Sequence, residues 1–176
     1  MAFSVQEMKT SLQTDGLLQA PHYEVSVNPP TGGGELLKIR ADSVSLPGVS
    51  FASVDAYKPY STGRSYTIPH TFTPQEMSVS HLIDTNSNVL ASLIKWASLV
   101  VDFTGSGSGP FTAGYFKEYV VDGNIFLYDL QGGIKKTYTI YSMFPSSIDQ
   151  VQMSWAGSDE IARVNVSYQF LDYTIS

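Results

Sequence analysis

The feature that most constrains this chain is a strict alternation of apolar and polar side chains near its C-terminus. Between Ala162 and Phe170 every second residue is apolar and the residues between them are polar. Successive side chains of a β-strand point to opposite faces, so this pattern predicts a strand with one buried face. Such a strand needs a sheet around it and a second layer over its apolar face, which favours a two-layered β domain.

Shorter alternations of the same kind run through most of the chain. They predict further strands at 23–27, 35–46, 66–72, 76–83, 124–129, 134–144 and 151–155. The Pro- and Gly-rich segment 28–34 cannot continue either strand beside it, so the first two strands are expected to form a hairpin.

Turn and proline residues refine this pattern. Pro69 favours an edge position or a bulge for the strand at 66–72. Leu130-Gln131-Gly132-Gly133 predicts the turn of a hairpin between 124–129 and 134–144. Phe144-Pro145 predicts a turn that leads to the strand at 151–155.

Two segments have helical periodicity instead. Ser4 followed by Glu7 fits a capping box and predicts a short helix within residues 1–20. Residues 86–102 are predicted to form the main helix, because their apolar side chains fall on one stripe. Within it, Leu93, Trp96 and Val100 are expected to pack against the core.

These elements predict one domain over residues 1–176, a length sufficient for a single hydrophobic core. The expected fold class is mainly β: an antiparallel β-sandwich or half-barrel with one buried α-helix and a short N-terminal helix.

Residues 47–63 have no clean period and are predicted to form a long loop. Loops of this length are usually functional or disordered, and one this rich in aromatic residues is a poor candidate for disorder. We therefore expect it to be an interaction loop that contacts a partner. The candidate contact residues are Pro47, Gly48, Phe51, Tyr57 and Tyr60.

Composition narrows the possible partners. Charged residues make up only 15% of the chain, and the net charge is −6, the wrong sign for gripping phosphate backbones. A surface with so few charges is typical of a protein that contacts other subunits. The chain contains no cysteine. No signal peptide is expected at the N-terminus, and the apolar segment 89–101 is too short to insert into a membrane.

The residues that could act in catalysis or bind a metal do not form a recognisable catalytic set. His22, His70 and His81 are far apart in sequence, and their spacing suggests no metal site. The carboxylates beside turns and strand ends read as solvated acids; they are Asp102, Glu118, Asp122, Asp129, Asp159 and Glu160. The Gly-rich segment 105–109 follows a helix, unlike a phosphate-binding loop. We therefore expect no enzymatic activity, no cofactor and no metal.

The order of elements resembles the tail tube proteins of contractile-tailed bacteriophages, including the tube-initiator proteins of their baseplates. The likeness covers nearly the whole chain and is strongest in the C-terminal third. It rests on residues 127–133, 144–148, 151–155 and 158–161, on the final strand to Tyr173, and on Ile94-Lys95-Trp96 in the main helix.

The resemblance implies a subunit that assembles as a hexameric ring, with strands from six chains closing a β-barrel around a lumen. Rings would stack into a tube within the virion tail, after assembly in the host cytoplasm. Implied partners are the sheath protein, the tape measure protein, and adjacent tube or baseplate proteins. DNA would pass through the lumen without specific binding, and acidic subunits would repel its phosphates from the wall.

Two alternatives remain open at this stage. The fold is also similar to the tube protein of type VI secretion systems, which would make the chain part of a bacterial injection tube. A carbohydrate-binding β-sandwich is the alternative from another class, since the chain's 11 tyrosines could form a sugar-binding face.

Overall fold

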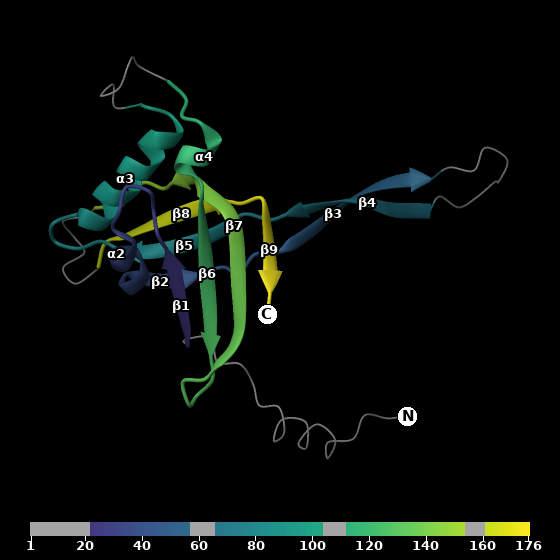
Figure 1. Ribbon diagram of the computed structural model, residues 1–176, viewed down its shortest axis with the longest axis horizontal. Helices are drawn as coiled ribbons and strands as arrows, with labels where there is room; N and C mark the ends of the chain where they lie inside the picture. The colour runs from purple at the N-terminus through teal and green to yellow at the C-terminus, as the bar shows by residue number, and fades with distance from the viewer. Residues whose placement is uncertain (1–21, 57–65, 104–111, 154–160) are drawn as a thin grey trace.

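The computed structural model describes residues 22–56, 66–103, 112–153 and 161–176 (Figure 1). The strands in these ranges are β1 (Tyr23–Val27), β2 (Ala41–Val44), β3 (Val49–Ala56), β4 (Tyr66–Pro74), β5 (Met77–Leu82), β6 (Val121–Tyr128), β7 (Ile134–Ile148), β8 (Arg163–Gln169) and β9 (Asp172–Ile175). The helices are α2 (Gly34–Ile39), α3 (Asn88–Val100) and α4 (Phe116–Tyr119). None of the helices in these ranges is long and apolar enough to cross a membrane.

Seven of the described strands form one strongly bent antiparallel sheet. Its order is β1-β6-β7-β8-β5-β2, and β9 also pairs with β7. The 15-residue strand β7 belongs to both halves: its first part pairs with β6 and β9, and its last part pairs with β8. We call β1, β6, β9 and the first part of β7 the β6 sheet, and the last part of β7 with β8, β5 and β2 the β8 sheet.

The bend in β7 has a local cause. Ser142 adopts a left-handed backbone conformation with φ 52°, which is uncommon outside glycine. Its backbone N–H donates to Asp122 Oδ1 at 2.9 Å, and this bond fixes the conformation at the point where β7 leaves the β6 sheet.

The core lies between the two sheets and α3. Leu93 and Trp96 are fully buried, and Val100 is half-buried. Trp96 packs against Tyr168 of β8 with ring centroids 5.7 Å apart, and its indole N–H donates to the Tyr119 carbonyl at 2.7 Å. The helix thus joins β8 to the short helix α4.

The two ends of the bent sheet approach each other without pairing. The Tyr23 hydroxyl of β1 donates to the Asp42 carbonyl of β2 at 2.6 Å, and Lys38 of α2 forms a 2.8 Å ion pair with Glu24 of β1. The monomer is therefore mainly β and antiparallel, as predicted, but it is not a closed barrel.

The prediction for residues 35–46 was wrong. These residues form α2 and then β2 rather than one strand. The alternation of Leu37 and Ile39 is misleading, because Leu37 is buried whereas Ile39 is 71% exposed. The expected hairpin with 23–27 is also absent, since β1 pairs with β6 and β2 pairs with β5.

Other predictions need smaller corrections. Residues 47–63 do not begin as a loop, because 49–56 form β3; residues 57–63 lie outside the described ranges, as does the predicted helix at 1–20. Phe144-Pro145 lies within β7 rather than in a turn, and residues 151–153 form no strand. The sequence interpretation also missed α4 and β9.

Candidate assembly surfaces

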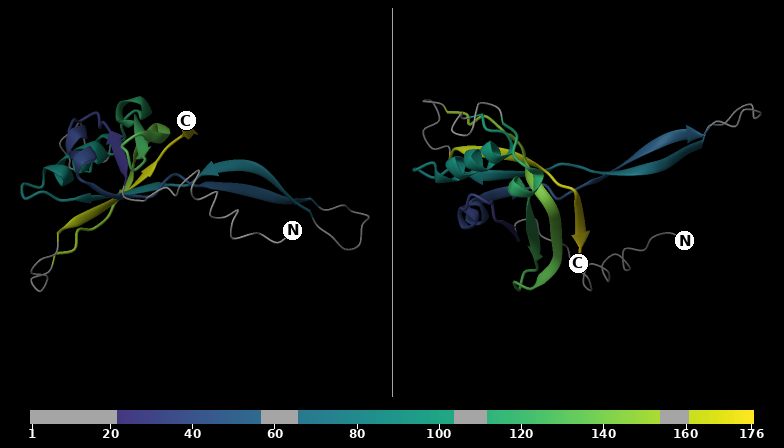
Figure 2. Two further views of the ribbon diagram at one scale, coloured as in Figure 1. Left: turned by 90° about the horizontal axis from the view of Figure 1, so that it is seen from below. Right: turned by 45° about the horizontal axis from the view of Figure 1, so that its top comes forward.

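The most exposed part of the described chain is the hairpin of β3 and β4, which we call the arm. It projects away from both sheets and stands clear of them in the views of Figure 2. The arm strands continue directly from β2 and β5, so the arm is an extension of the β8 sheet. A two-stranded ribbon alone is at best marginally stable in water, so a partner that packs against the arm would stabilise it.

The arm exposes apolar side chains on both of its faces. Phe51 pairs with Phe72 near the root, with ring centroids 6.3 Å apart, and Val54 pairs with Ile68 farther out. Phe51 and Val54 are three residues apart in β3, so the two pairs lie on opposite faces. A bulge in β4, where the register shifts between Ala52 and Ser53, separates them. The predicted irregularity near Pro69 is thus confirmed, since Pro69 pairs with Ser53 beside this bulge.

The five predicted contact residues occupy different environments. Phe51 is 64% exposed on the arm. Pro47 is buried and Gly48 is half-buried at the arm root, where the Gly48 carbonyl accepts a hydrogen bond from the Gln75 backbone N–H at 3.0 Å. Tyr57 and Tyr60 lie outside the described residues. Sequence reasoning missed Phe72 and Ile68 as contact candidates, although their alternation was visible.

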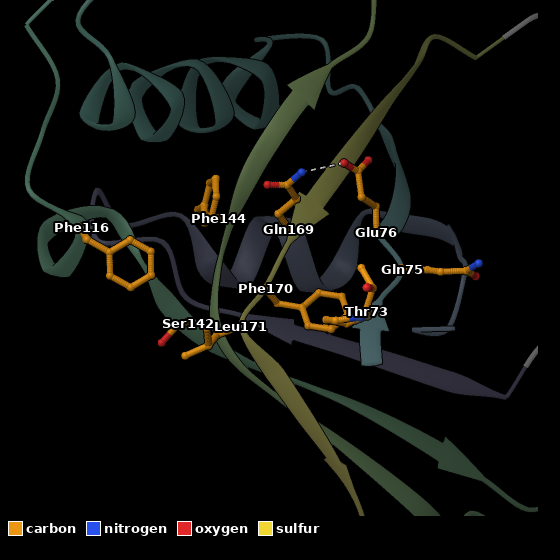
Figure 3. Close-up of a pocket in the computed structure, with 10 residues that line it drawn as sticks. Thr73, Gln75, Glu76, Phe116, Ser142, Phe144, Gln169, Phe170 and Leu171 are labelled. Carbon is orange, nitrogen blue, oxygen red and sulfur yellow. Dashed lines mark hydrogen bonds between the residues drawn. The ribbon is translucent and has the colours of Figure 1, made fainter. Parts of the chain in front are cut away.

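A notch of about 370 Å³ lies at the arm root (Figure 3). Phe116 of α4, Phe144 of β7 and Phe170 after β8 supply its aromatic lining. Phe144 is held in edge-to-face contact with Phe116, at a centroid distance of 6.4 Å. Gln169 donates to Glu76 at 2.9 Å across the rim. The rest of the lining is Pro74 and Leu171 together with the polar residues Thr73, Gln75, Glu76, Ser142 and Gln169. The lining contains neither histidine nor a pair of carboxylates, so it suits packing more than catalysis.

The β8 sheet has an unpaired edge on each side. Among the described strands, β2 pairs only with β5, and residues 144–148 of β7 pair only with β8. Ser147 and Asp149 lie in register with Ser167 and Asn165 of β8, and the backbone N–H of Asp149 donates to Asn165. Ile148, between them, therefore points its own N–H and carbonyl away from β8.

The histidines do not form a reactive site. His81 of β5 is buried, with Nε2 3.5 Å from the Tyr168 hydroxyl, and burial lowers its pKa to about 4. His70 is exposed on the arm, and His22 precedes β1. In the described ranges, no group of three or more histidine, aspartate or glutamate side chains could hold a metal ion.

The candidate carboxylates have structural surroundings. Asp122 accepts the Ser142 N–H, and Asp129 accepts the N–H groups of Gln131 and Gly133 in the β6–β7 turn. The hydrogen bond from Gly133 is the main cause that holds the pKa of Asp129 below its ordinary value. Glu118 lies in α4 and Asp102 follows α3, whereas Asp159 and Glu160 lie outside the described residues.

Solved structures with the same fold come from an extracellular contractile injection system, an anti-feeding prophage and a gene transfer agent. A chain of the cryo-EM structure of an extracellular contractile injection system, the PVC sheath-tube complex in its extended state, aligns with a TM-score of 0.66 at 15% identity, covering 99% of each chain. A chain of the anti-feeding prophage baseplate aligns at 0.63 and 9% identity, covering 88% of this chain and 92% of the other. A chain from the virion of a native gene transfer agent particle aligns at 0.54 and 9% identity, covering 91% and 99%.

At these identities the structural matches show a shared fold. No curated protein sequence matches the chain. The family model described as phage tail tube protein, however, matches residues 4–176, which is almost the full length. The chain therefore belongs to the phage tail tube protein family, a family of structural proteins and not of enzymes.

Proposed function

We propose that this chain is a tube subunit of a contractile phage tail, which assembles as hexameric rings that stack into the channel for DNA ejection. The observation that carries the proposal is the β8 sheet with its two unpaired edges. Its strands alternate in direction across the sheet, so β2 of one copy can pair antiparallel with residues 144–148 of the next. Unpaired edges invite pairing, and a repeated head-to-tail contact closes a ring.

The six-fold symmetry is supported by the structural matches. The matched anti-feeding prophage baseplate is described as 6-fold symmetrised, and a matched tail of an empty gene transfer agent particle has C6 symmetry. The match to a sheath-tube complex supports a sheath protein as a partner around the tube. Both the main tube and the baseplate-proximal tube initiator fit this proposal, with tape measure and baseplate proteins as further partners in the virion tail.

The arm would make contacts between subunits or between rings. Its exposed apolar pairs, Phe51 with Phe72 and Val54 with Ile68, have no covering layer among the described residues. The notch beside the arm root offers an apolar surface of matching character on an adjacent copy. Tyr57 and Tyr60, which follow β3 in the sequence, stay candidate contacts of the same kind.

Negative-stain electron microscopy across a concentration series tests the proposal. We expect hollow rings or tubes, with long tubes favouring the main tube protein and isolated or briefly stacked rings favouring an initiator. Persistent monomers would contradict self-assembly and favour the carbohydrate-binding alternative.

A proline at the free edge sharpens this test. Ile148→Pro removes an N–H that points away from β8, so it should block pairing with a neighbour while keeping the internal ladder. Ile148→Ala, which keeps the N–H, is the matched control and should still form rings. Circular dichroism checks that both variants fold; equal ring formation by the two variants would rule out pairing at this edge.

A further inference from the structure

Serine side chains form a continuous row across the β8 sheet. Ser147 of β7 pairs with Ser167 of β8, and Ser167 pairs with Ser78 of β5. Ser45, just after β2, completes the row, because its backbone N–H donates to the Ser78 carbonyl at 2.8 Å and the two hydroxyls are hydrogen-bonded. The row brings together residues from 45 to 167 of the sequence, so only the strand register reveals it.

A second polar row lies beside the first on the same face. Asn165 of β8 pairs with Ser80 of β5, and Ser80 pairs with Ser43 of β2. We call these two rows together the serine face. Most of these side chains are exposed, whereas Ser80 is 9% exposed and Ser167 is half-buried.

The direction of the serine face is fixed by the residues between its rows. Val44, Val79 and Val166 lie side by side on the opposite face, and Val79 and Val166 are fully buried in the core. A slip of one residue would bury hydroxyls and expose valines, so the register is strongly determined.

One charged residue belongs to these rows: the exposed Asp149, just after β7, stands beside Asn165 at the start of the second row, and the other members of both rows are neutral. Two further charged groups flank the rows: Arg163 forms a 2.9 Å ion pair with Asp42 at one end, and Glu76 accepts from Gln169 at the other.

We propose that the serine face lines the channel of the tube, as a hydroxyl-rich wall without basic side chains in its rows, past which a polyanion such as DNA slides. The proposal rests on the function proposed above and adds which face points inward. Serine is depleted at protein–protein interfaces, and the rows hold no aromatic anchor for a partner subunit. They also hold no lysine or arginine, the groups that bind phosphates. Asp149 adds one acid to this face in each subunit, in line with the expected repulsion of phosphates from the wall.

The absence of cysteine allows a direct test by site-specific labelling. Ser78→Cys is placed in the middle of the serine face, and Thr174→Cys on the exposed outward face of β9 serves as the comparison. Assembled tubes are treated with a small fluorescent maleimide, or with maleimide-coated gold particles. The particles are chosen to be wider than the tube lumen, which electron microscopy of the same tubes measures. Subunits held below the assembly concentration are treated in parallel.

If the serine face lines the channel, the Ser78→Cys thiol reacts with both reagents in free subunits but only with the small reagent in tubes. Gold bound along the tubes at position 78 would place this face outside. If the Ser78→Cys thiol reacts with neither reagent in tubes, the serine face is buried between subunits. If gold binds the tubes of Ser78→Cys, and Thr174→Cys in tubes reacts with the small reagent but not with gold, the β6 sheet lines the channel instead. Each of these three results overturns the inference while leaving tube formation intact, whereas absence of rings would overturn the proposed function itself.

Discussion

The two-sheet body and the arm both carry large apolar side chains, but the body buries them and the arm exposes them. In the body, Met77, Trp96 and Val164 are fully buried, because two sheets and α3 enclose them. In the arm, Phe51 and Val54 are 64% and 55% exposed, because the ribbon has no second layer among the described residues. The body therefore carries the stability of the subunit, and the arm carries exposed apolar surface of the kind that marks interaction sites.

The largest expected loss of stability follows truncation of the body's central side chain. Trp96→Ala removes the contact with Tyr168 and the hydrogen bond to the Tyr119 carbonyl, and it leaves a large cavity. We expect the free energy of unfolding to fall by about 3 to 5 kcal/mol, measured by urea denaturation. Phe51→Ala on the arm is the comparison, and a similar loss there would contradict the division between body and arm.

The body should also be sensitive to mild acid through His81. Its pKa in the folded protein is about 4, against an ordinary value of 6.5, because burial disfavours the charged ring. Stability is therefore fully present above pH 6.5 and is lost as the pH falls toward 4. We expect a loss of about 3 kcal/mol by pH 4, measured by denaturation at a series of pH values.

His81→Gln provides the control for this pH dependence. Glutamine does not titrate, so the variant should show a flatter profile between pH 6.5 and 4, whatever its absolute stability. Asp129, whose pKa is lowered from 3.8, contributes stability that is lost only at still lower pH. An unchanged slope in the variant would assign the acid sensitivity to other groups.

Sequence reasoning succeeded where a pattern was local. The strand β8, the hairpin of β6 and β7 and the helix α3 each carry a complete periodic run with turn residues beside it. Reasoning failed where the outcome depended on distant partners: β1 pairs with β6 about 100 residues later, and the serine face exists only through register. Pro145 illustrates the same limit, because a register shift beside it lets proline sit within β7.

The arm was misread for a related reason. Phe51 and Val54 are three residues apart, so they do not alternate on one face and resemble a loop. The bulge in the pairing with β4 accommodates this spacing, and it was foreseen only as a possibility near Pro69. The sequence therefore singled out Phe51 of the arm as a contact candidate, which stays a prediction, while the pairing of Phe51 with Phe72 and of Val54 with Ile68 needed the structure.

A medium effect is expected from filling the close approach between strands of the body. A Cβ at Gly123 of β6 would lie 2.6 Å from Met143 Sδ and 3.3 Å from Val27 Cγ2. Gly123→Ala should therefore cost about 1 to 3 kcal/mol, measured by urea denaturation. Gly132→Ala is a poor control, because Gly132 has φ 81°; Ser26→Ala on the outward face of β1 is better and should change stability little.

The smallest effect on stability should accompany a decisive effect on assembly. Replacing Phe51 and Phe72 together by serine removes one apolar pair from the arm, whose rings are 6.3 Å apart and exposed to solvent. Since an exposed aromatic pair contributes about 1 kcal/mol or less, the unfolding transition should barely move. Electron microscopy and sedimentation should nevertheless show loss of tubes, because the same pair is buried only when a neighbour covers it.

A matched double variant, Thr71 and Thr73 to serine, changes β4 positions on the other face and should still assemble. Tubes of normal length from the phenylalanine variant would show that the arm's apolar pair is not an assembly contact, and the contrast between body and arm would then concern folding alone.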